Sequence, residues 1–332
     1  MVERLFHVLI REVCAEKNIK LEKLSYDWIL QLSKNGKVRH ITSTRFDINP
    51  EASGAIACDK YATFEVLRSQ NIPVINHIMI FNPMDRASLI SDSGIWLTIA
   101  SEFLKYGCLV VKPNYGCEGM GVTLCHTMKE TEIAIMNLFK KESSISICPY
   151  YDIKTEYRTF YLDGEVFLIY GKTKPFVIGD GKSSIAKLIE NLHLPEKSVV
   201  YDNIKKLDLN YIPEIKEKID ISWKFNLSGG AKPTVLENGE LYRNIEQLAI
   251  REGKAMNISF ATIDIIETMD GNLYVLEINS GIGATIFSET VDGGYEIIKD
   301  IYRHSLDKLF QWEHTNEMKF IWFHLIFYFK GY

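Results

Sequence analysis

The stretch LVVKPNYGCEGMGV, residues 109–122, most constrains what this chain can fold into. Its apolar start predicts a buried strand that ends at Lys112, and Gly116, Gly119 and Gly121 follow closely. Glycine lets the backbone approach a ligand, and successive backbone N–H groups form concave sites that bind anions. A strand that delivers a lysine to such a loop therefore predicts a phosphate site.

This loop fits neither of two familiar nucleotide-binding patterns. The dinucleotide fingerprint reads G-x-G-x-x-G and opens a helix, whereas this loop reads G-x-x-G-x-G and leads into a second apolar strand at 122–125. The run VIGDGKSS at 177–184 ends like a P-loop, but Phe176 stands where a P-loop needs its first glycine. We therefore interpret 177–184 as a turn in which Ser183 caps the next helix, and 109–125 as a hairpin that folds over phosphates.

Turn signals and apolar periodicity predict an α+β fold. Asp163-Gly164 and Asp270-Gly271 each separate alternating runs, which is the pattern of a β-hairpin. The expected helices lie at 59–70, 94–106, 129–141, 183–192 and 241–256, and further strands at 74–81 and 144–151. We expect four segments: a short N-terminal α/β segment at 1–57, a small lobe with the glycine loop at 58–148, a larger lobe with a mostly antiparallel sheet at 149–310, and a hydrophobic tail at 311–332.

Composition narrows the class of protein. The formal net charge of −5 gives no basic field for nucleic acid. The six cysteines include no C-x-x-C pair, which favours reduced thiols and a cytoplasmic protein. A catalytic Cys117 is the sharper alternative, but no signature surrounds it. The apolar run at 320–329 is too short to span a membrane, so we expect it to dock on the core or on a second subunit, with a membrane-surface foot as the alternative and a homodimer left open.

The second hairpin carries a candidate metal site. Glu277 and Asn279 are two residues apart and share one face of a strand, while Leu276 and Ile278 are expected to face the core. The hairpin brings Asp264 across from them. Two carboxylates and an amide oxygen suit Mg²⁺ that bridges phosphate oxygens. A merely solvated polar face is the alternative, which the lysine and glycine loop upstream disfavour.

In this order the motifs resemble the ATP-grasp superfamily over about residues 45–290, most closely the glutathione-synthetase-like and cyanophycin-synthetase-like carboxylate–amine ligases. The segments that carry the resemblance are DINPEASGAIACDKYATFEVLRSQNIPV with Lys60, VVKPNYGCEGMGV with Lys112, EYR at 156–158, VIGDGKSSIAKLIE at 177–190, NLSGGA at 226–231 and DIIETMDGNLYVLEIN at 264–279.

The resemblance implies an ATP-grasp fold, in which two α+β lobes clasp ATP, and a ligase that joins a carboxylate to an amine through an acyl phosphate. It implies ATP contacts from Lys60, Lys112, Gly116, Gly119, Gly121, Tyr150, Asp152 and Glu156, Mg²⁺ (or Mn²⁺) ligands Asp264, Glu277 and Asn279, and catalytic roles for Arg158, Lys172 and Asn226. Among these, Glu156 would accept hydrogen bonds from ribose, and Arg158 would stabilise the acyl phosphate. A solvated lysine and a turn asparagine are equally good interpretations of Lys172 and Asn226.

Three departures from the family pattern leave the substrate open. Pro149 has no N–H, so the adenine donor is expected near Asp152. The segment before residue 58 is short, and EINSGIG lacks the proline that often follows the metal asparagine. We expect an amino acid or short peptide as substrate, that is, a small-molecule or peptide carboxylate and an amine. The alternatives are a non-catalytic ATP-binding scaffold and, less favoured, a phosphohistidine- or kinase-type activity.

Overall fold

A computed structural model describes residues 3–116, 119–192 and 207–311. Its contacts divide the chain into two units, one made of Glu51–Asn279 and the other of the residues before and after that span. This division differs from the four expected segments, because the helices after Ser280 group with the N-terminal residues. The expected boundary near residue 148 lies inside one unit and stays a prediction. Cys117 and the apolar run at 320–329 lie outside the described residues.

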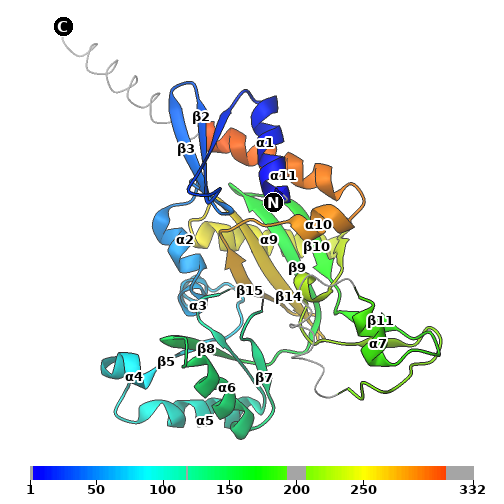
Figure 1. The fold of residues 1–332 in the computed structure, drawn as a ribbon. Helices are drawn as coiled ribbons and strands as arrows, with labels where there is room; N and C mark the ends of the chain where they lie inside the picture. The colour runs from blue at the N-terminus through cyan, green and yellow to red at the C-terminus, as the bar shows by residue number, and fades with distance from the viewer. Residues whose placement is uncertain (1–2, 117–118, 193–206, 312–332) are drawn as a thin grey trace. The chain divides into compact units, whose positions relative to one another are not determined.

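The unit that contains the N-terminus is a helix-and-sheet structure closed by C-terminal helices (Figure 1). Its elements are α1 (Leu5–Glu16), β1 (Lys20–Leu24), β2 (Ile29–Lys34), β3 (Lys37–Thr42), β4 (Arg45–Phe46), α10 (Thr285–Thr290) and α11 (Gly294–Gln311), with the four strands in sequential order. Phe6 packs edge-on against Tyr302 at 5.3 Å between ring centroids, and Phe46 stacks on Tyr302 at 6.0 Å. These rings join α1, β4 and α11 in one core.

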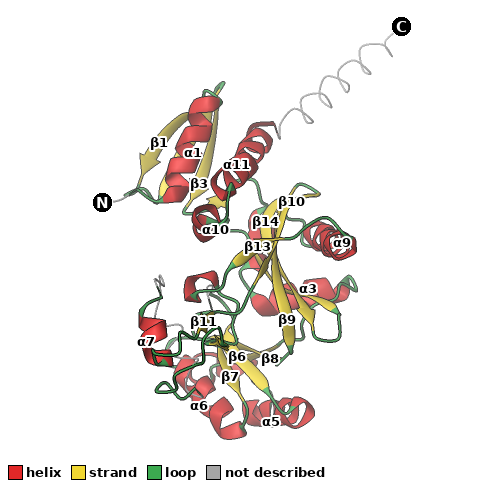
Figure 2. Cartoon of the chain, turned by 90° about the vertical axis from the view of Figure 1, so that its right-hand side faces the viewer, coloured by secondary structure: helices red, strands yellow, loops and turns green. Residues whose placement is uncertain are grey.

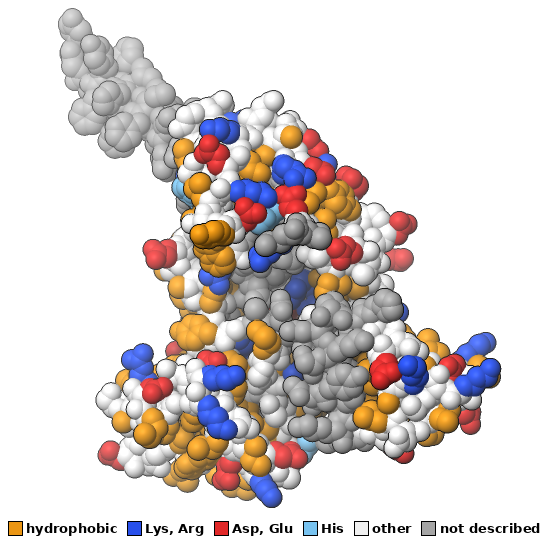
Figure 3. Space-filling model, viewed as in Figure 1, with side chains coloured by type: hydrophobic (Ala, Val, Ile, Leu, Met, Phe, Trp, Pro, Cys, Tyr) orange, Lys and Arg blue, Asp and Glu red, His pale blue; other side chains and the backbone are white. Residues whose placement is uncertain are grey.

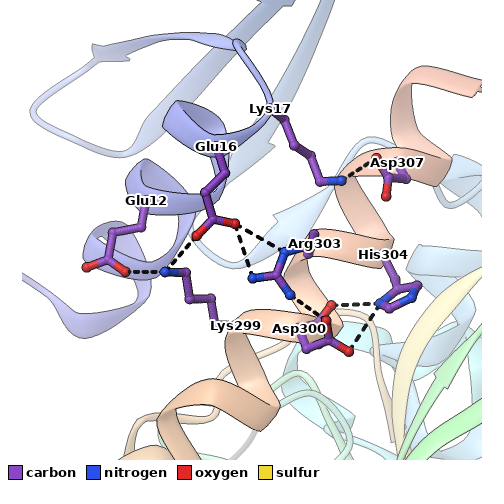
Figure 4. A network of polar contacts seen from close by, with 8 residues as sticks. All are labelled: Glu12, Glu16, Lys17, Lys299, Asp300, Arg303, His304 and Asp307. Carbon is purple, nitrogen blue, oxygen red and sulfur yellow. Dashed lines mark hydrogen bonds and ion pairs between the residues drawn. The ribbon is translucent and has the colours of Figure 1, made fainter.

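Ion pairs join α1 to α11 on the surface of this unit (Figure 4). Lys299 Nζ lies 2.8 Å from carboxylate oxygens of both Glu12 and Glu16, and Lys17 Nζ lies 2.6 Å from Asp307. Ion pairs at a protein surface contribute little to stability, because solvent screens them. They fix how the two helices pair more than they stabilise the unit.

The other unit contains a small four-stranded antiparallel sheet. Its strands, in spatial order, are β5 (Ile78–Phe81), β8 (Ser144–Pro149), β6 (Leu109–Pro113) and β7 (Thr123–Cys125), accompanied by α4 (Pro83–Arg86), η1 (Ala87–Leu89), α5 (Gly94–Tyr106) and α6 (Met128–Leu138). Figure 2 shows α5 and α6 below this sheet. Leu109 and Val111 pack in the core on the helix side, whereas Val110 packs with Cys148 in a separate cluster. Side chains alternate along a strand, so Lys112 shares the second face with Val110.

The same unit contains a larger antiparallel sheet, as expected. Its strands, in spatial order, are β13 (Pro233–Val235), β10 (Glu165–Lys172), β9 (Ile153–Leu162), β14 (Phe260–Thr268) and β15 (Leu273–Asn279), with α2 (Glu51–Ala57), α3 (Lys60–Ser69) and α9 (Glu240–Ala255) nearby. A side module holds β11 (Phe176–Ile178), α7 (Ile185–Glu190), β12 (Lys218–Asp220) and η2 (Leu227–Gly229). Ile263 and Ile265 pack with Ile245 and Ala249 of α9, so Asp264, between them, lies on the opposite face.

Both predicted hairpins are confirmed. β9 pairs with β10 around Asp163 and Gly164, whose φ angles of 48° and 95° match a tight hairpin turn. β14 pairs with β15 around Gly271, at φ 83°. Hairpins pair residues that are close in sequence, so turn chemistry alone identifies them.

Two local expectations were wrong. The strand expected at 74–81 is shorter, since β5 begins at Ile78 and Val74 forms only an isolated bridge with Val275. Ser183 does not cap α7; Ser184 does, by accepting from the Lys187 N–H at 3.4 Å. Ser183 instead donates its hydroxyl to Asp180 at 2.8 Å.

Within the part of the chain that the structure describes, no helix is both long and apolar enough to cross a membrane. Figure 3 shows acidic and basic side chains interspersed over the face drawn. This surface agrees with the modest net charge of −5.

Candidate active site

Four charged side chains from adjacent strands meet on the face of the large sheet opposite α9. Strand pairing places Arg158 across from Asp264 and Lys172 across from Glu156. Arg158 binds Asp264 through two hydrogen bonds, Nε to Oδ1 at 2.8 Å and Nη2 to Oδ2 at 2.6 Å. Lys172 Nζ donates to Asp264 Oδ1 at 3.2 Å and to Glu156 Oε1 at 2.5 Å. We call these four residues the ion cluster.

Burial makes the balance of charge in the ion cluster important. Burial alone would raise the pKa of Asp264, but the adjacent Arg158 and Lys172 outweigh it and hold that pKa below its usual value. Burial raises the pKa of Glu156, although Lys172 opposes that shift. Pairing with cations is how a charge such as that of Asp264 survives in a buried site. The Arg158 side chain is 22% exposed, compared with 4% for Lys172. Arg158 is thus the cation of the cluster that a ligand can reach.

The predicted metal hairpin is formed, with one difference. Glu277 lies opposite Asp264, as expected, and the Asn279 amide donates to Glu277 Oε1 at 3.2 Å. The pairing shifts after Asp264, which is a β-bulge. The expectation that Leu276 and Ile278 share one face was wrong: Leu276 packs with the cluster around Cys148, whereas Ile278 packs in the core under α9. The bulge changes the phase of side-chain alternation.

The three oxygen-bearing side chains of this hairpin are not equally free to bind a hard cation such as Mg²⁺. Within the described ranges, no group of three or more His, Cys, Asp or Glu side chains is arranged to hold a metal ion. Glu277 and Asn279 are adjacent oxygen donors at the edge of the ion cluster. Both Asp264 oxygens are engaged by Arg158 and Lys172. Glu277 and Asn279 therefore fit Mg²⁺ directly, and Asp264 would have to share its oxygens with two cations.

The glycine loop lies between lysines. Lys60 is the first residue of α3, which Asp59 caps, and its Nζ donates to the Gly116 carbonyl at 2.9 Å. Lys224 Nζ donates to the Gly119 carbonyl at 3.1 Å. At Gly119, a Cβ atom would lie 2.1 Å from Asn226 Nδ2, and φ there is +69°. The structure thus brings the predicted residues Lys60, Gly119 and Asn226 to one loop.

Gly116 and Gly121 also have positive φ angles, 133° and 69°. Such angles are strained for residues with a Cβ. The glycine pattern therefore reflects the backbone of the loop itself. The described conformation at these two positions favours glycine.

The remaining predicted ATP residues occupy the strand ends around this loop. Lys112, 5% exposed, lies on the face of the small sheet that also holds Cys148 of β8. The ring of Tyr150 lies 6.2 Å from that of Trp223, and the Asp152 carbonyl accepts from the Met269 N–H at 3.0 Å. These contacts place Tyr150 and Asp152 in the β8–β9 connector, as expected. They do not join either residue to the ion cluster.

A small cavity of about 10 Å³, with room for about one water molecule, lies between the two halves of the candidate site. It is lined by Ala57, Lys60, Thr63, Phe64, Val74, His77, Leu276, Glu277 and Ile278. The lysine at the glycine loop and the carboxylate of the metal hairpin therefore border one space. His77, Ser146 beside it, and Lys224 were not predicted. None of them belongs to a recognisable motif, although Lys224 lies close in sequence to Asn226.

Several known proteins are similar to this chain in sequence. The RimK-like ATP-grasp domain family matches residues 218–303, which include the metal hairpin. Cyanophycin synthetase of Trichormus variabilis is 26% identical over 294 residues, covering 81% of this chain and 31% of that protein. Tetrahydromethanopterin:alpha-L-glutamate ligase of Methanocaldococcus jannaschii is 25% identical over 237 residues, covering 70% of this chain and 61% of the relative. The chain thus spans about a third of the cyanophycin synthetase.

Solved structures agree with the fold. The bifunctional glutathione synthetase of Pasteurella multocida superposes with a TM-score of 0.54 at 19% identity, covering 89% of this chain and 43% of that chain. D-alanine–D-alanine ligase of Bacillus anthracis gives a TM-score of 0.52 at 19% identity, covering 79% and 69%. The expected ATP-grasp fold is therefore confirmed, and in sequence the chain resembles ATP-grasp ligases, as its motifs predict.

Proposed function

We propose that this protein is an ATP- and Mg²⁺-dependent carboxylate–amine ligase that forms an amide bond through an acyl phosphate. The observation that carries the proposal is the ion cluster: Arg158 is held by Asp264, yet remains its most exposed cation. A protein that only binds ATP has no need for a fixed cation away from the phosphate loop. A ligase needs one where negative charge develops on the reacting group.

ATP enters this reaction as a substrate. Lys60 and Lys112 hold its α- and β-phosphates, and Gly116, Gly119 and Gly121 cover the β- and γ-phosphates with backbone N–H groups. Tyr150 and Asp152 border the adenine, and Glu156 binds the ribose. The bond between Lys172 and Glu156, at 2.5 Å, means that Glu156 would share its oxygens between lysine and ribose.

The metal ion belongs beside the β15 donors. Glu277 and Asn279 would hold Mg²⁺, with Asp264 as a shared ligand, and Mn²⁺ would fit the same oxygens. The ion would neutralise charge on the phosphate oxygens.

The chain's own residues suit the two chemical steps. A carboxylate oxygen of the substrate attacks the γ-phosphorus, and the bond to the β-phosphate oxygen breaks to release ADP. The amine nitrogen then attacks the acyl carbon, the carbon–oxygen bond breaks, and phosphate leaves as the amine loses a proton. Arg158, Lys172 and Asn226 stabilise the phosphorylated intermediate, and Asn226 also lies against Gly119 of the glycine loop.

The acid and amine would be amino acids or short peptides. The formal net charge of −5 argues against a nucleic-acid substrate. We place the reaction in the cytoplasm, where ATP and reduced thiols are found, and a homodimer is compatible with the apolar run at 320–329.

The test is ADP release measured against pairs of amino acids and short peptides, with Mg²⁺ and with EDTA. ADP release that requires both an acid and an amine supports the ligase. Glu277→Ala should abolish it while unfolding at the wild-type temperature. ATP binding without substrate-dependent ADP release would support the scaffold, and phosphate transfer to protein would support a kinase-type activity.

A further inference from the structure

His77 is a buried polar side chain with no role in the reaction described so far. It precedes β5 and is 4% exposed. Its Nδ1 lies 2.6 Å from Ser146 Oγ, and its ring lies 6.1 Å from that of Phe64. The same ring borders the cavity that Lys60 and Glu277 line. A ring fixed on one side and open to a cavity on the other is well placed to bind a ligand.

Ser146 determines which ring nitrogen carries the proton. It lies on β8, fully buried, directly opposite Lys112 of β6. Among the described residues, the Ser146 hydroxyl has a single hydrogen-bond partner, His77 Nδ1. A buried hydroxyl hydrogen requires an acceptor, and an unprotonated Nδ1 is the acceptor within reach. Ser146 therefore donates to Nδ1, which leaves the ring proton on Nε2.

The surroundings keep this ring uncharged. Burial lowers the pKa of His77 well below its ordinary value, and the positive charges of Lys112 and Lys60 lower it further. In the described part of the chain Nε2 has no hydrogen-bond partner, yet it is not among the buried atoms that lack one. The Nε2–H group therefore keeps some solvent exposure, and its ring borders the cavity. It offers a neutral donor between two lysines.

We propose that His77 is a nucleotide-binding residue, whose Nε2–H donates to an oxygen of the phosphate chain that Lys60 also binds, and that Ser146 is its positioning residue. The inference rests on the proposed function, because it requires ATP at this cavity. A lysine attracts phosphate through its charge, which salt screens. A neutral imidazole contributes through hydrogen-bond geometry, so salt should affect its contribution less.

The first test is ATP affinity by calorimetry, with Mg²⁺, in the full-length protein. His77→Phe keeps the aromatic packing and removes the donor, so the Kd for ATP should rise at least about tenfold. His77→Gln restores a donor and should recover most of that loss. His126→Gln, at an exposed histidine in the same sheet region, is the matched control. The dependence of log Kd on salt should be unchanged in His77→Phe and weaker in Lys60→Met.

The second test determines which ring nitrogen of His77 carries the proton. In ¹⁵N spectra of the imidazole, His77 should show protonated Nε2 and unprotonated Nδ1 between about pH 6 and 8. Ser146→Ala should give a mixture of tautomers and an intermediate loss of ATP affinity. A protonated Nδ1 in the wild type would overturn the tautomer and with it the proposal.

Failure of the His77 proposal can be distinguished from failure of the proposed function. If the wild type binds ATP and folded His77→Phe binds it equally well, only this inference falls. If the wild type binds no ATP, the proposed function falls together with it.

Discussion

Arg158 Nη2 and Asp264 Oδ2 lie 2.6 Å apart across the β9–β14 pairing, and Arg158 Nε completes a two-bond contact to the same carboxylate. A lysine at position 158 would keep the charge but not this planar, two-point geometry. The arginine is thus held in one orientation before any substrate arrives.

Loss of this fixed cation should slow the chemistry more than it weakens ATP binding. Arg158→Ala is expected to lower kcat by about 100- to 1,000-fold, the usual effect of removing a transition-state donor. The kcat of Arg158→Lys should lie between those of the wild type and Arg158→Ala. The measurements are ADP release with the best acid–amine pair and calorimetric ATP affinity. Loss of ATP binding with unchanged kcat would oppose the assignment.

Lys112 should contribute mainly to ATP binding. Its side chain is buried on the face of the small sheet that also holds Cys148 of β8, and a charge-assisted contact contributes about 1.5–3 kcal/mol. Lys112→Met keeps the apolar stem and should weaken ATP binding about 10- to 150-fold. Lys187→Met, at an exposed lysine of α7, is the matched control. Equal ATP affinities in the two variants would show that Lys112 does not contact the nucleotide.

Gly119→Ala should disturb the glycine loop. The new Cβ would meet Asn226 at 2.1 Å and would also strain a φ of +69°. Gly271→Ala, at φ +83° with nothing within 4 Å, carries only the backbone strain. We therefore expect Gly119→Ala to raise the Kd for ATP, while Gly271→Ala lowers only the melting temperature. The idea fails if both variants bind ATP like the wild type.

Because of Glu252, we expect the free energy of unfolding to fall as pH rises. It is fully buried in α9, and neither carboxyl oxygen has a hydrogen-bond partner among the described residues. Burial, with a smaller contribution from Asp264, raises its pKa well above the ordinary value. Above about pH 4.3 the unfolded chain releases the Glu252 proton, whereas the folded state keeps it. The contribution of Glu252 to stability is therefore complete below that pH. Between that pH and the folded pKa, the free energy of unfolding declines by at most about 1.4 kcal/mol per pH unit.

Glu252→Gln removes this titration. Its melting temperature should match that of the wild type near pH 4.5 and exceed it at pH 8. Glu246→Gln, which alters another glutamate of the same helix, controls for the change of charge. Parallel melting curves for Glu252→Gln and wild type across this range would refute the buried neutral acid.

Local chemistry explains why much of the fold was predictable. Asp163-Gly164 and Asp270-Gly271 determine their hairpins, and Asp59 caps α3 by accepting from the Ala62 N–H at 2.8 Å. Each signal acts over a few residues. The glycine loop and the pairing of Asp264 with Glu277 followed from the same kind of local pattern.

What the sequence could not reveal depends on contacts between distant segments. The bulge after Asp264 moves Leu276 away from the face of Ile278, and no sequence pattern in the strand predicts this bulge. His77 meets Ser146 across 69 positions of sequence. Lys172 lies two strands from Asp264, so its bond to that carboxylate becomes visible only once the strand order is known.

The most direct test of the ligase follows one oxygen atom. If the substrate carboxylate attacks the γ-phosphorus, its oxygen leaves with the phosphate when the amine displaces it. With an acid labelled by ¹⁸O in both carboxylate oxygens, mass spectrometry should find one ¹⁸O in each phosphate released and none in ADP. Released phosphate without any ¹⁸O from the acid would have taken its new oxygen from water. That result would show simple ATP hydrolysis and would contradict the ligase.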